Sequence, residues 1–171
     1  MALLNFSGKL QLFADDGVLM YTSETIENLY SQMNADLSIL HSWCNVNHMI
    51  LNNEKTKYIV FENSSSNTDA LNFLEITYNN LVIERVNNYS YLGLIINSKF
   101  IWDNHIYSLK RSIIPYIFAI GRARHLLPRK SLLMIYNAFI QSRLVYLNPI
   151  WSGSPKNKLL EIEILQKRVL K

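Results

Sequence analysis

The chain has 171 residues, of which 49% are apolar and 18% charged, and this balance excludes a disordered protein. Its one cysteine, Cys44, excludes a disulfide within the chain and suits a reducing compartment. No apolar run approaches the roughly 18 residues that cross a bilayer, and the first residues show no secretory signal, so we expect an intracellular protein, cytoplasmic or nuclear, with no membrane partner.

The formal net charge of +4 is unevenly distributed. Residues 1–104 carry 5 basic and 11 acidic side chains, a balance of −6, whereas residues 105–171 carry 12 basic and 2 acidic ones, a balance of +10. This asymmetry favours a polyanion such as nucleic acid as a partner of the second half. A basic helical surface that is merely solvated would give the same count, so charge alone leaves both interpretations open.

An acidic pair, Asp15 and Asp16, lies between two segments of strand-forming residues, 9–14 and 17–22. Asp and Gly favour tight turns, so the pattern predicts a β-hairpin that turns at this pair. The pair can be no more than a turn, or it can bind a divalent metal that serves phosphoryl or nucleotidyl transfer. Neighbouring strand residues point to opposite faces, so a metal site would need a further carboxylate from another element.

A helix is predicted next, with Ser23 or Thr25 as its N-cap and apolar residues at helical spacing as far as Val46. Its last turns and the residues just beyond carry three possible zinc ligands at spacings of three and four residues: His41, Cys44 and His48. Cys44 also continues the apolar stripe and no fourth ligand is evident, which favours a role in the core or at the surface.

The first part continues with short strands and turns. We expect a strand at 57–62, a polar loop at 63–69, a hairpin over 74–86 that turns at Asn79–Asn80, and a strand at 89–97 interrupted at Gly93. Before the first of these strands, Lys55 and Lys57 could neutralise a phosphate or protonate a leaving group. They could equally be solvent-facing residues at a strand end.

Three helical segments are predicted after Trp102, at 103–126, 129–147 and 156–170. Pro115 lies inside the first and should kink or divide it, because proline lacks the N–H group that a helix interior requires. The fold class is therefore α+β: antiparallel strands with a packed helix, followed by an all-helical basic region.

Four segments, in this order, closely resemble the reverse transcriptases of non-LTR retrotransposons, in particular those of jockey-type mobile elements. The likeness covers residues 8–171 and is carried by LQLFADDGVLMY, WCNVNHMILNNEKTKYIVF, VNNYSYLGLIINSKFIWDNHI and ARHLLPRKSLLMIYNAFIQSRLVYLNPIW. It implies an RNA-directed DNA polymerase, which adds deoxynucleotides to a primer 3′-hydroxyl by two-metal nucleotidyl transfer with Mg²⁺ as cofactor.

The resemblance assigns roles to residues of the first part. Phe13 to Asp16 match the acidic motif of the polymerase palm, so Asp15 and Asp16 are implied as catalytic Mg²⁺ ligands. Lys55 matches a lysine near the phosphates of the incoming nucleotide and is implied as a general acid for pyrophosphate departure. Residues 91–93 match the primer-grip hairpin, which positions the primer 3′ end: Tyr91, Leu92 and Gly93.

The resemblance also implies two domains: residues 1–100 as the C-terminal part of a palm that includes the primer grip, and residues 101–171 as a thumb-like region. A thumb tracks the template–primer duplex, mainly through phosphates. The implied partners are an RNA template, a DNA primer and deoxynucleoside triphosphates. The implied nucleic-acid-binding residues are Lys110, Arg111, Arg122, Arg124, Arg129 and Lys130.

Departures from the family pattern bear on activity. Gly17 stands where Thr or Ser is usual, Pro115 interrupts a thumb helix, and residues 1–14 contain no acidic side chain. The family's third catalytic Asp, its nucleotide-selecting helix and its fingers are expected to be absent, which predicts a polymerase fragment that is inactive alone. The alternatives are a non-catalytic nucleic-acid-binding module and a retrotransposon remnant without a selected role.

Overall fold

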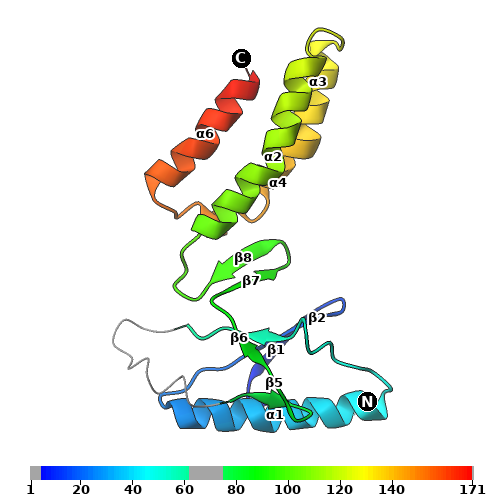
Figure 1. Ribbon diagram of the computed structural model, residues 1–171, viewed down its shortest axis with the longest axis vertical. Helices are drawn as coiled ribbons and strands as arrows, with labels where there is room; N and C mark the ends of the chain where they lie inside the picture. Colours follow the sequence, from blue (N-terminus) through cyan, green and yellow to red (C-terminus); the bar gives the residue numbers. More distant parts are fainter. Residues whose placement is uncertain (1–4, 62–74, 171) are drawn as a thin grey trace. The chain divides into compact units, whose positions relative to one another are not determined.

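The structure is a computed structural model that describes residues 5–61 and 75–170 (Figure 1). The chain divides into an N-terminal unit, Met1–Val86, and a C-terminal unit, Asn87–Lys171. The boundary expected from the resemblance lies after residue 100 instead. The structural division comes earlier because Leu94 is buried in the hydrophobic core of the helical region, so the strands around it belong to that region. The predicted loop at 63–69 lies outside the described residues.

The N-terminal unit contains one long helix and short paired strands. Its elements are β1 (Lys9–Phe13), β2 (Asp16–Met20), α1 (Ile26–Val46), β3 (Lys57–Tyr58), β4 (Thr77–Tyr78), β5 (Leu81–Val82) and β6 (Glu84–Arg85). The predicted first hairpin is confirmed, since β1 and β2 pair antiparallel from Lys9 opposite Met20 to Phe13 opposite Asp16. Together with the second unit, these elements confirm the α+β fold class.

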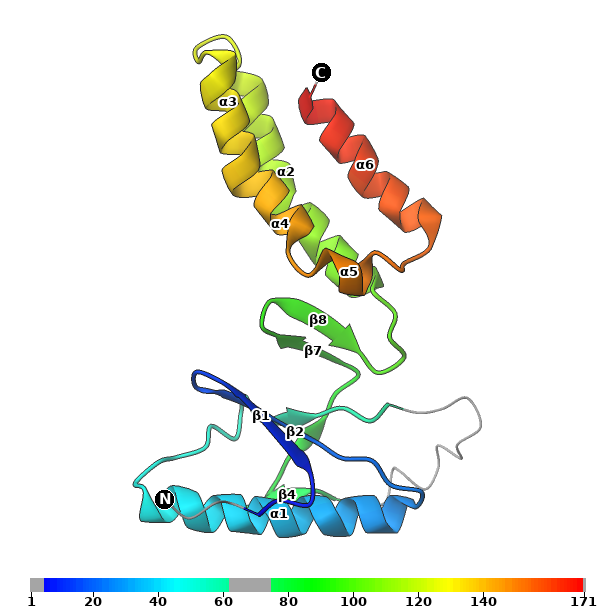
Figure 2. The same ribbon diagram turned by 180° about the vertical axis from the view of Figure 1, so that it is seen from behind.

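Helix α1 starts and ends close to where the sequence predicts. Thr25 is its N-cap, and its side chain accepts a hydrogen bond from the Asn28 N–H group (3.4 Å), which would otherwise lack a helical partner. The helix packs against β4, as Figure 2 shows. Residues from the helix and the following strands form the core of this unit: Tyr30, Leu37, Ile76, Tyr78 and Ile83.

The second predicted hairpin is also confirmed, with β4 and β5 joined by Asn79 and Asn80. Both residues have positive φ angles, 50° and 61°, a conformation that Asn tolerates better than most residues do. The predicted strand at 57–62 is shorter than expected. Within its described residues, 57–61, only β3 forms, and it pairs parallel with β6, so Lys57 lies opposite Glu84. This pairing is the exception to the expected antiparallel strands.

In the C-terminal unit, the segment predicted as one interrupted strand is a hairpin. Strands β7 (Asn88–Tyr91) and β8 (Leu94–Asn97) pair antiparallel around Leu92 and Gly93. Both turn residues have positive φ angles, 47° and 78°, which reverse the chain where an interruption alone was expected.

The three predicted helical segments are confirmed. They are α2 (Asp103–Ala123), a middle segment of α3 (Arg129–Tyr136), the π-helical turn η2 (Asn137–Gln141) and α4 (Ser142–Val145), and the last helix α6 (Lys156–Leu170). A short helix, α5 (Asn148–Trp151), precedes α6. Within this unit α2 lies beside both α3 and α6 (Figures 1 and 2). Among the described residues, no helix has the length and apolar character needed to cross a membrane.

The core of the C-terminal unit forms along one face of α2. Its buried residues recur every three or four positions, the spacing that places side chains on one helix face. The buried residues of the core are Leu94, Ile106, Leu109, Ile113, Ile117, Ile120, Tyr136, Ile140, Leu144, Trp151 and Ile162.

Pro115 does not divide α2, which is a single helix from Asp103 to Ala123. The proline supplies no N–H group to the helix, so a carbonyl group one turn earlier loses its donor. Arg143 donates from Nη1 to the nearby carbonyl oxygen of Ser112 (3.0 Å), three residues before the proline. The carbonyl that loses its donor is that of Arg111, four residues before the proline, so Arg143 binds the helix backbone at the neighbouring carbonyl.

Candidate functional site

The acidic turn, Asp15 and Asp16, is at the end of the β1–β2 hairpin. Asp15 is in the two-residue loop with Ala14, whose φ angle is 54°, and Asp16 is the first residue of β2. Both side chains are exposed, and neither has an ion-pair partner within the part of the chain that the structure describes. The turn therefore presents two charged carboxylates to solvent.

Carboxylate oxygens are the ligands that Mg²⁺ prefers, and Mg²⁺ usually keeps several waters while one or two protein carboxylates bind it. The donor chemistry of the acidic turn fits this ion. However, no group of three or more His, Cys, Asp or Glu residues within 5–61 and 75–170 is arranged to hold a metal. The two aspartates are thus part of a possible site that requires further oxygen donors.

Lys55, the predicted general acid, lies in an exposed turn between α1 and β3. Its backbone N–H donates to Oδ1 of Asn52 (3.1 Å), which shapes this turn. The neighbouring Lys57 forms an ion pair with Glu84 (2.6 Å) across the β3–β6 pair. The structure therefore gives Lys57 a local partner and places Lys55 in the same unit as the acidic turn.

The three possible zinc ligands of α1 lie in different surroundings. Cys44 is buried, and the His41 ring packs edge-on against Tyr78 with 5.3 Å between ring centroids. His48 is exposed, beyond the end of the helix, with a φ angle of 53°. These surroundings fit packing and surface roles.

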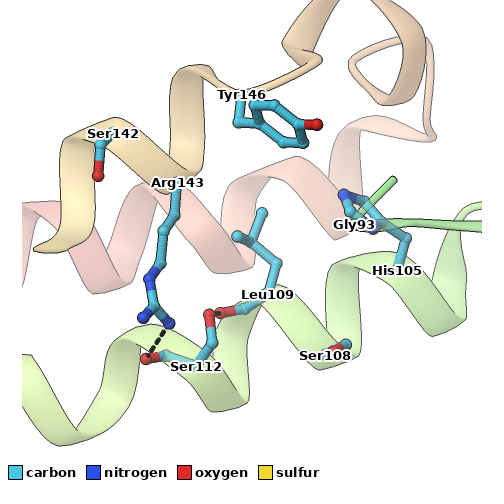
Figure 3. A pocket seen from close by; sticks show the side chains of 8 residues that line it. All are labelled: Gly93, His105, Ser108, Leu109, Ser112, Ser142, Arg143 and Tyr146. Carbon is cyan, nitrogen blue, oxygen red and sulfur yellow. Dashed lines mark hydrogen bonds between the residues drawn. The ribbon is translucent and has the colours of Figure 1, made fainter. Parts of the chain in front are cut away.

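In the C-terminal unit, the residues predicted as a primer grip lie at the end of the β7–β8 hairpin: Tyr91 is the last residue of β7, and Leu92 and Gly93 form the turn. The carbonyl oxygen of Leu92 accepts a hydrogen bond from the Tyr146 hydroxyl group (2.8 Å), which fixes the turn to the segment after α4. Gly93 and Tyr146 line a pocket of about 370 Å³ (Figure 3). Its other lining residues are His105, Ser108, Leu109, Ser112, Ser142 and Arg143.

Arg143 supplies the permanent positive charge of this pocket. In Figure 3 its side chain extends from α4 to the Ser112 carbonyl group on α2. Its guanidinium also lies over the Tyr116 ring, 5.0 Å from the centroid, a cation–π arrangement that holds the group in place. Sequence reasoning missed Arg143. The signal that could have found it was a lone charged residue inside the mostly apolar segment 138–147.

His105 is the second polar group of the pocket that sequence reasoning missed. It is 7% exposed, and this burial lowers its pKa below the ordinary value, which favours the neutral ring. Its Nδ1 accepts a hydrogen bond from the Ile95 N–H group (3.4 Å), which connects α2 to β8. Its ring centroid lies 6.0 Å from that of Trp151.

The six predicted nucleic-acid-binding residues differ in exposure and in partners. Lys110 is partly buried and paired with Glu161, whose pKa is lowered by this hydrogen bond and by the charge of Lys110. Arg111 is exposed and lies over the Tyr107 ring, 6.0 Å from the centroid. The remaining four are exposed and flank the loop between α2 and α3; we call them the basic tip: Arg122, Arg124, Arg129 and Lys130.

The fold and these sites describe an α+β protein with an exposed acidic turn in one unit and a basic helical surface in the other. Comparison with known proteins adds a distant similarity to a retrotransposon polymerase. The chain is 22% identical over 162 residues to the RNA-directed DNA polymerase from the mobile element jockey of Drosophila funebris. The similarity spans 93% of this chain and 17% of that polymerase. No family model and no solved structure matches the chain.

This distant similarity supports a relationship to retrotransposon reverse transcriptases. The chain spans about a sixth of the length of this relative, so the activity and substrates of a complete polymerase are proposals for this chain.

Proposed function

We propose that this chain is a segment of a non-LTR retrotransposon RNA-directed DNA polymerase. In the reaction of such a polymerase, the primer 3′-oxygen forms a bond to the α-phosphorus of a deoxynucleoside triphosphate. The bond from that phosphorus to the bridging oxygen breaks, pyrophosphate leaves, and the hydroxyl proton is released. When bound, Mg²⁺ would stabilise the charge on the reacting oxygens, and Asp15 and Asp16 are the residues of this chain that would hold it.

The exposed acidic turn carries this proposal, taken together with similarity that spans 93% of the chain. A turn with a purely structural role needs no pair of adjacent charges, and like charges in contact repel each other. Both carboxylates are at a hairpin end that other groups can approach. This arrangement suits residues that bind a cation brought together with a phosphorylated substrate.

The proposal includes a limit on activity. Among the described residues the acidic turn has no third carboxylate beside it, and catalytic geometry requires a complete set of ligands. We expect the purified chain to show no primer extension with Mg²⁺. Extension by this chain, abolished in an Asp15→Ala variant, would contradict the proposed incompleteness while supporting the proposed chemistry.

The proposed roles of the second unit are tested by fluorescence anisotropy with two RNA–DNA hybrids, one with a recessed primer 3′ end and one blunt. A polymerase segment is expected to bind the recessed end more tightly, and a Gly93→Ala variant should reduce this preference because it distorts the proposed primer-grip turn. A Gly153→Ala variant is the matched control. Equal affinity for both hybrids would argue against a primer-positioning role.

The basic tip favours a second candidate function, non-catalytic binding of nucleic acid. Two of its cations, Arg129 and Lys130, are in the first turn of α3, where the helix dipole disfavours positive charge and an anionic partner would relieve the repulsion. This function predicts equal affinity for recessed and blunt hybrids and no effect of Gly93→Ala.

Under either function, replacing all four basic-tip residues by Gln should weaken binding and flatten its salt dependence. The logarithmic salt slope should fall by about 0.9 for each phosphate that the variant no longer neutralises. The comparison is with a double variant of Lys156 and Lys167, exposed cations of α6 of which the second is paired with Glu163, set against a double variant of Arg129 and Lys130. An unchanged slope in the basic-tip variant would exclude this surface as the nucleic-acid interface.

A further inference from the structure

Asp36 is a carboxylate that neither the acidic turn nor the basic helices account for. It lies on α1 and is 1% exposed, although burial of a charged group is costly unless hydrogen bonds compensate it. Each of its oxygens accepts one backbone hydrogen bond: Oδ1 from the Ser7 N–H group (3.0 Å) and Oδ2 from the Gly8 N–H group (2.9 Å). Ser7 and Gly8 are the two residues that precede β1.

Gly8 also packs closely against Tyr21 at the start of the hairpin. A Cβ atom on Gly8 would lie 2.4 Å from Cε1 of Tyr21, so the absence of a side chain lets the ring pack against the backbone. The Tyr21 hydroxyl group is buried, and burial and the nearby charge of Asp36 raise its pKa. Because Tyr21 directly follows β2, these three residues hold both strands where the hairpin begins. We call Gly8, Tyr21 and Asp36 the root clamp.

The rest of the hairpin has little packing of its own. Every residue of β1 is exposed, and in β2 only Val18 and Leu19 are half-buried. A two-stranded ribbon is marginally stable by itself in water. The direction of this ribbon is therefore set at its root rather than along its length.

The geometry makes the acidic turn sensitive to the root clamp. A strand of five residues is about 16 Å long at a rise of about 3.3 Å per residue. A rotation of about 10° at the root would then move the turn by about 3 Å. Functional groups need placement to within about 0.5 Å. Mobility at the base of the hairpin would therefore spread the two aspartates over many positions.

We infer that Asp36 is the positioning residue of the acidic turn: through Ser7 and Gly8 it fixes the direction in which β1 and β2 present Asp15 and Asp16. That the positioned aspartates bind a metal rests on the proposed function. The positioning itself depends only on the hydrogen bonds, the burial of Asp36 and the contact between Gly8 and Tyr21.

The test is NMR on the full chain, with amide hydrogen exchange and heteronuclear NOE values for wild type and Asp36→Ala. We expect the Ser7 and Gly8 amides to exchange at least 10-fold faster, and the NOE values of Asp15 and Asp16 to fall to those of a mobile segment. The amides of Ile76 and Tyr78 in the core should keep their protection. Glu27→Ala, an exposed acidic residue of the same helix, is the matched control and should change none of these values.

A second variant covers the case in which Asp36→Ala fails to fold. Gly8→Ala disturbs the root clamp from the other side and keeps the Asp36 carboxylate, so it should also increase the mobility of the acidic turn while the core stays protected. The inference is overturned if the turn keeps wild-type NOE values in either folded variant. It is also overturned if both variants lose turn order and core protection together, since Asp36 would then have a general structural role.

Mn²⁺ separates this inference from the proposed function. Added to the wild-type chain, Mn²⁺ should broaden the amide signals of residues 14–17, and the broadening should weaken in Asp36→Ala. If wild type shows no selective broadening, metal binding by the acidic turn alone is disproved, while the exchange and NOE data still decide whether Asp36 positions the turn.

Discussion

Gly93 has a φ angle of +78°, in the left-handed region where a residue with a side chain is strained. An added Cβ would meet only Cε1 of Tyr146, at an ordinary contact distance of 3.5 Å, so the cost of a substitution is conformational rather than steric. We expect Gly93→Ala to lower the free energy of unfolding by about 1–2 kcal/mol, measured by urea denaturation. Gly153→Ala, where a Cβ meets nothing within 4 Å, should stay within about 0.5 kcal/mol of wild type.

The burial of His105 leads us to expect that stability depends on pH. Burial lowers its pKa in the folded chain, so the unfolded chain takes up a proton at a higher pH than the folded chain does. The stabilising contribution is therefore fully present above the unfolded value of about 6.5 and is lost as pH falls through the lower folded pKa. Protonation at Nδ1 would also break the hydrogen bond from Ile95.

Thermal melts at a series of pH values between about 7 and 5 measure this effect. The melting temperature of His105→Gln should fall less steeply with decreasing pH than that of wild type, because the titrating group is gone. His125→Gln, which replaces an exposed histidine of the α2–α3 loop, should follow the wild-type curve. Identical pH curves for wild type and His105→Gln would show that His105 is not responsible.

At the scale of elements, the continuity of α2 through Pro115 leads to a prediction about stability. Proline inside a helix costs about 3 kcal/mol, yet α2 continues through it while Arg143 donates to the Ser112 carbonyl group. Pro115 is exposed, so Pro115→Ala removes no buried contact. We expect an increase of about 1–3 kcal/mol in the free energy of unfolding. A decrease in stability would mean that the proline holds α2 in a shape that the fold requires.

Several elements were predictable from local chemistry, and others were not. Helix α1 was predictable because Thr25 supplies the N-cap hydrogen bond at its start, and the 77–82 hairpin because Asn79 and Asn80 accept positive φ angles. The local pattern at 88–97 wrongly predicted one interrupted strand, since Leu at a positive φ angle is rare and Leu92 gave no turn signal, whereas the family resemblance predicted a hairpin. The parallel β3–β6 pair joins distant segments, which no local pattern indicates.

For the candidate site, too, local patterns could be predicted and contacts between distant segments could not. The position of the acidic turn could be predicted, because adjacent Asp residues followed by Gly between strand-forming segments favour a turn. The role of Asp36 could not, because one acidic residue in an amphipathic helix is typical of a solvated surface. Its burial depends on the backbone at Ser7 and Gly8, which lie far from it in sequence.

At the scale of the whole molecule, the described residues form two hydrophobic cores, one in each unit. Ile140, with 0% of its side chain exposed, lies in the core of the C-terminal unit. Ile140→Ala removes buried methyl and methylene groups and leaves a cavity, so the free energy of unfolding of this unit should fall by about 2–5 kcal/mol. Protection of the Tyr30 and Leu37 amides in the other core should stay unchanged, because each core supports its own cooperative unit.

Native-state hydrogen exchange of the full chain separates these two responses. The matched control is Ile164→Ala, since this side chain is 56% exposed and its truncation should change stability by less than about 0.5 kcal/mol. Equal losses in both units would show that the chain unfolds as one cooperative body. Absence of protection in the wild-type C-terminal unit would favour a remnant without a formed core, and the basic tip would then have no fixed surface from which to bind nucleic acid.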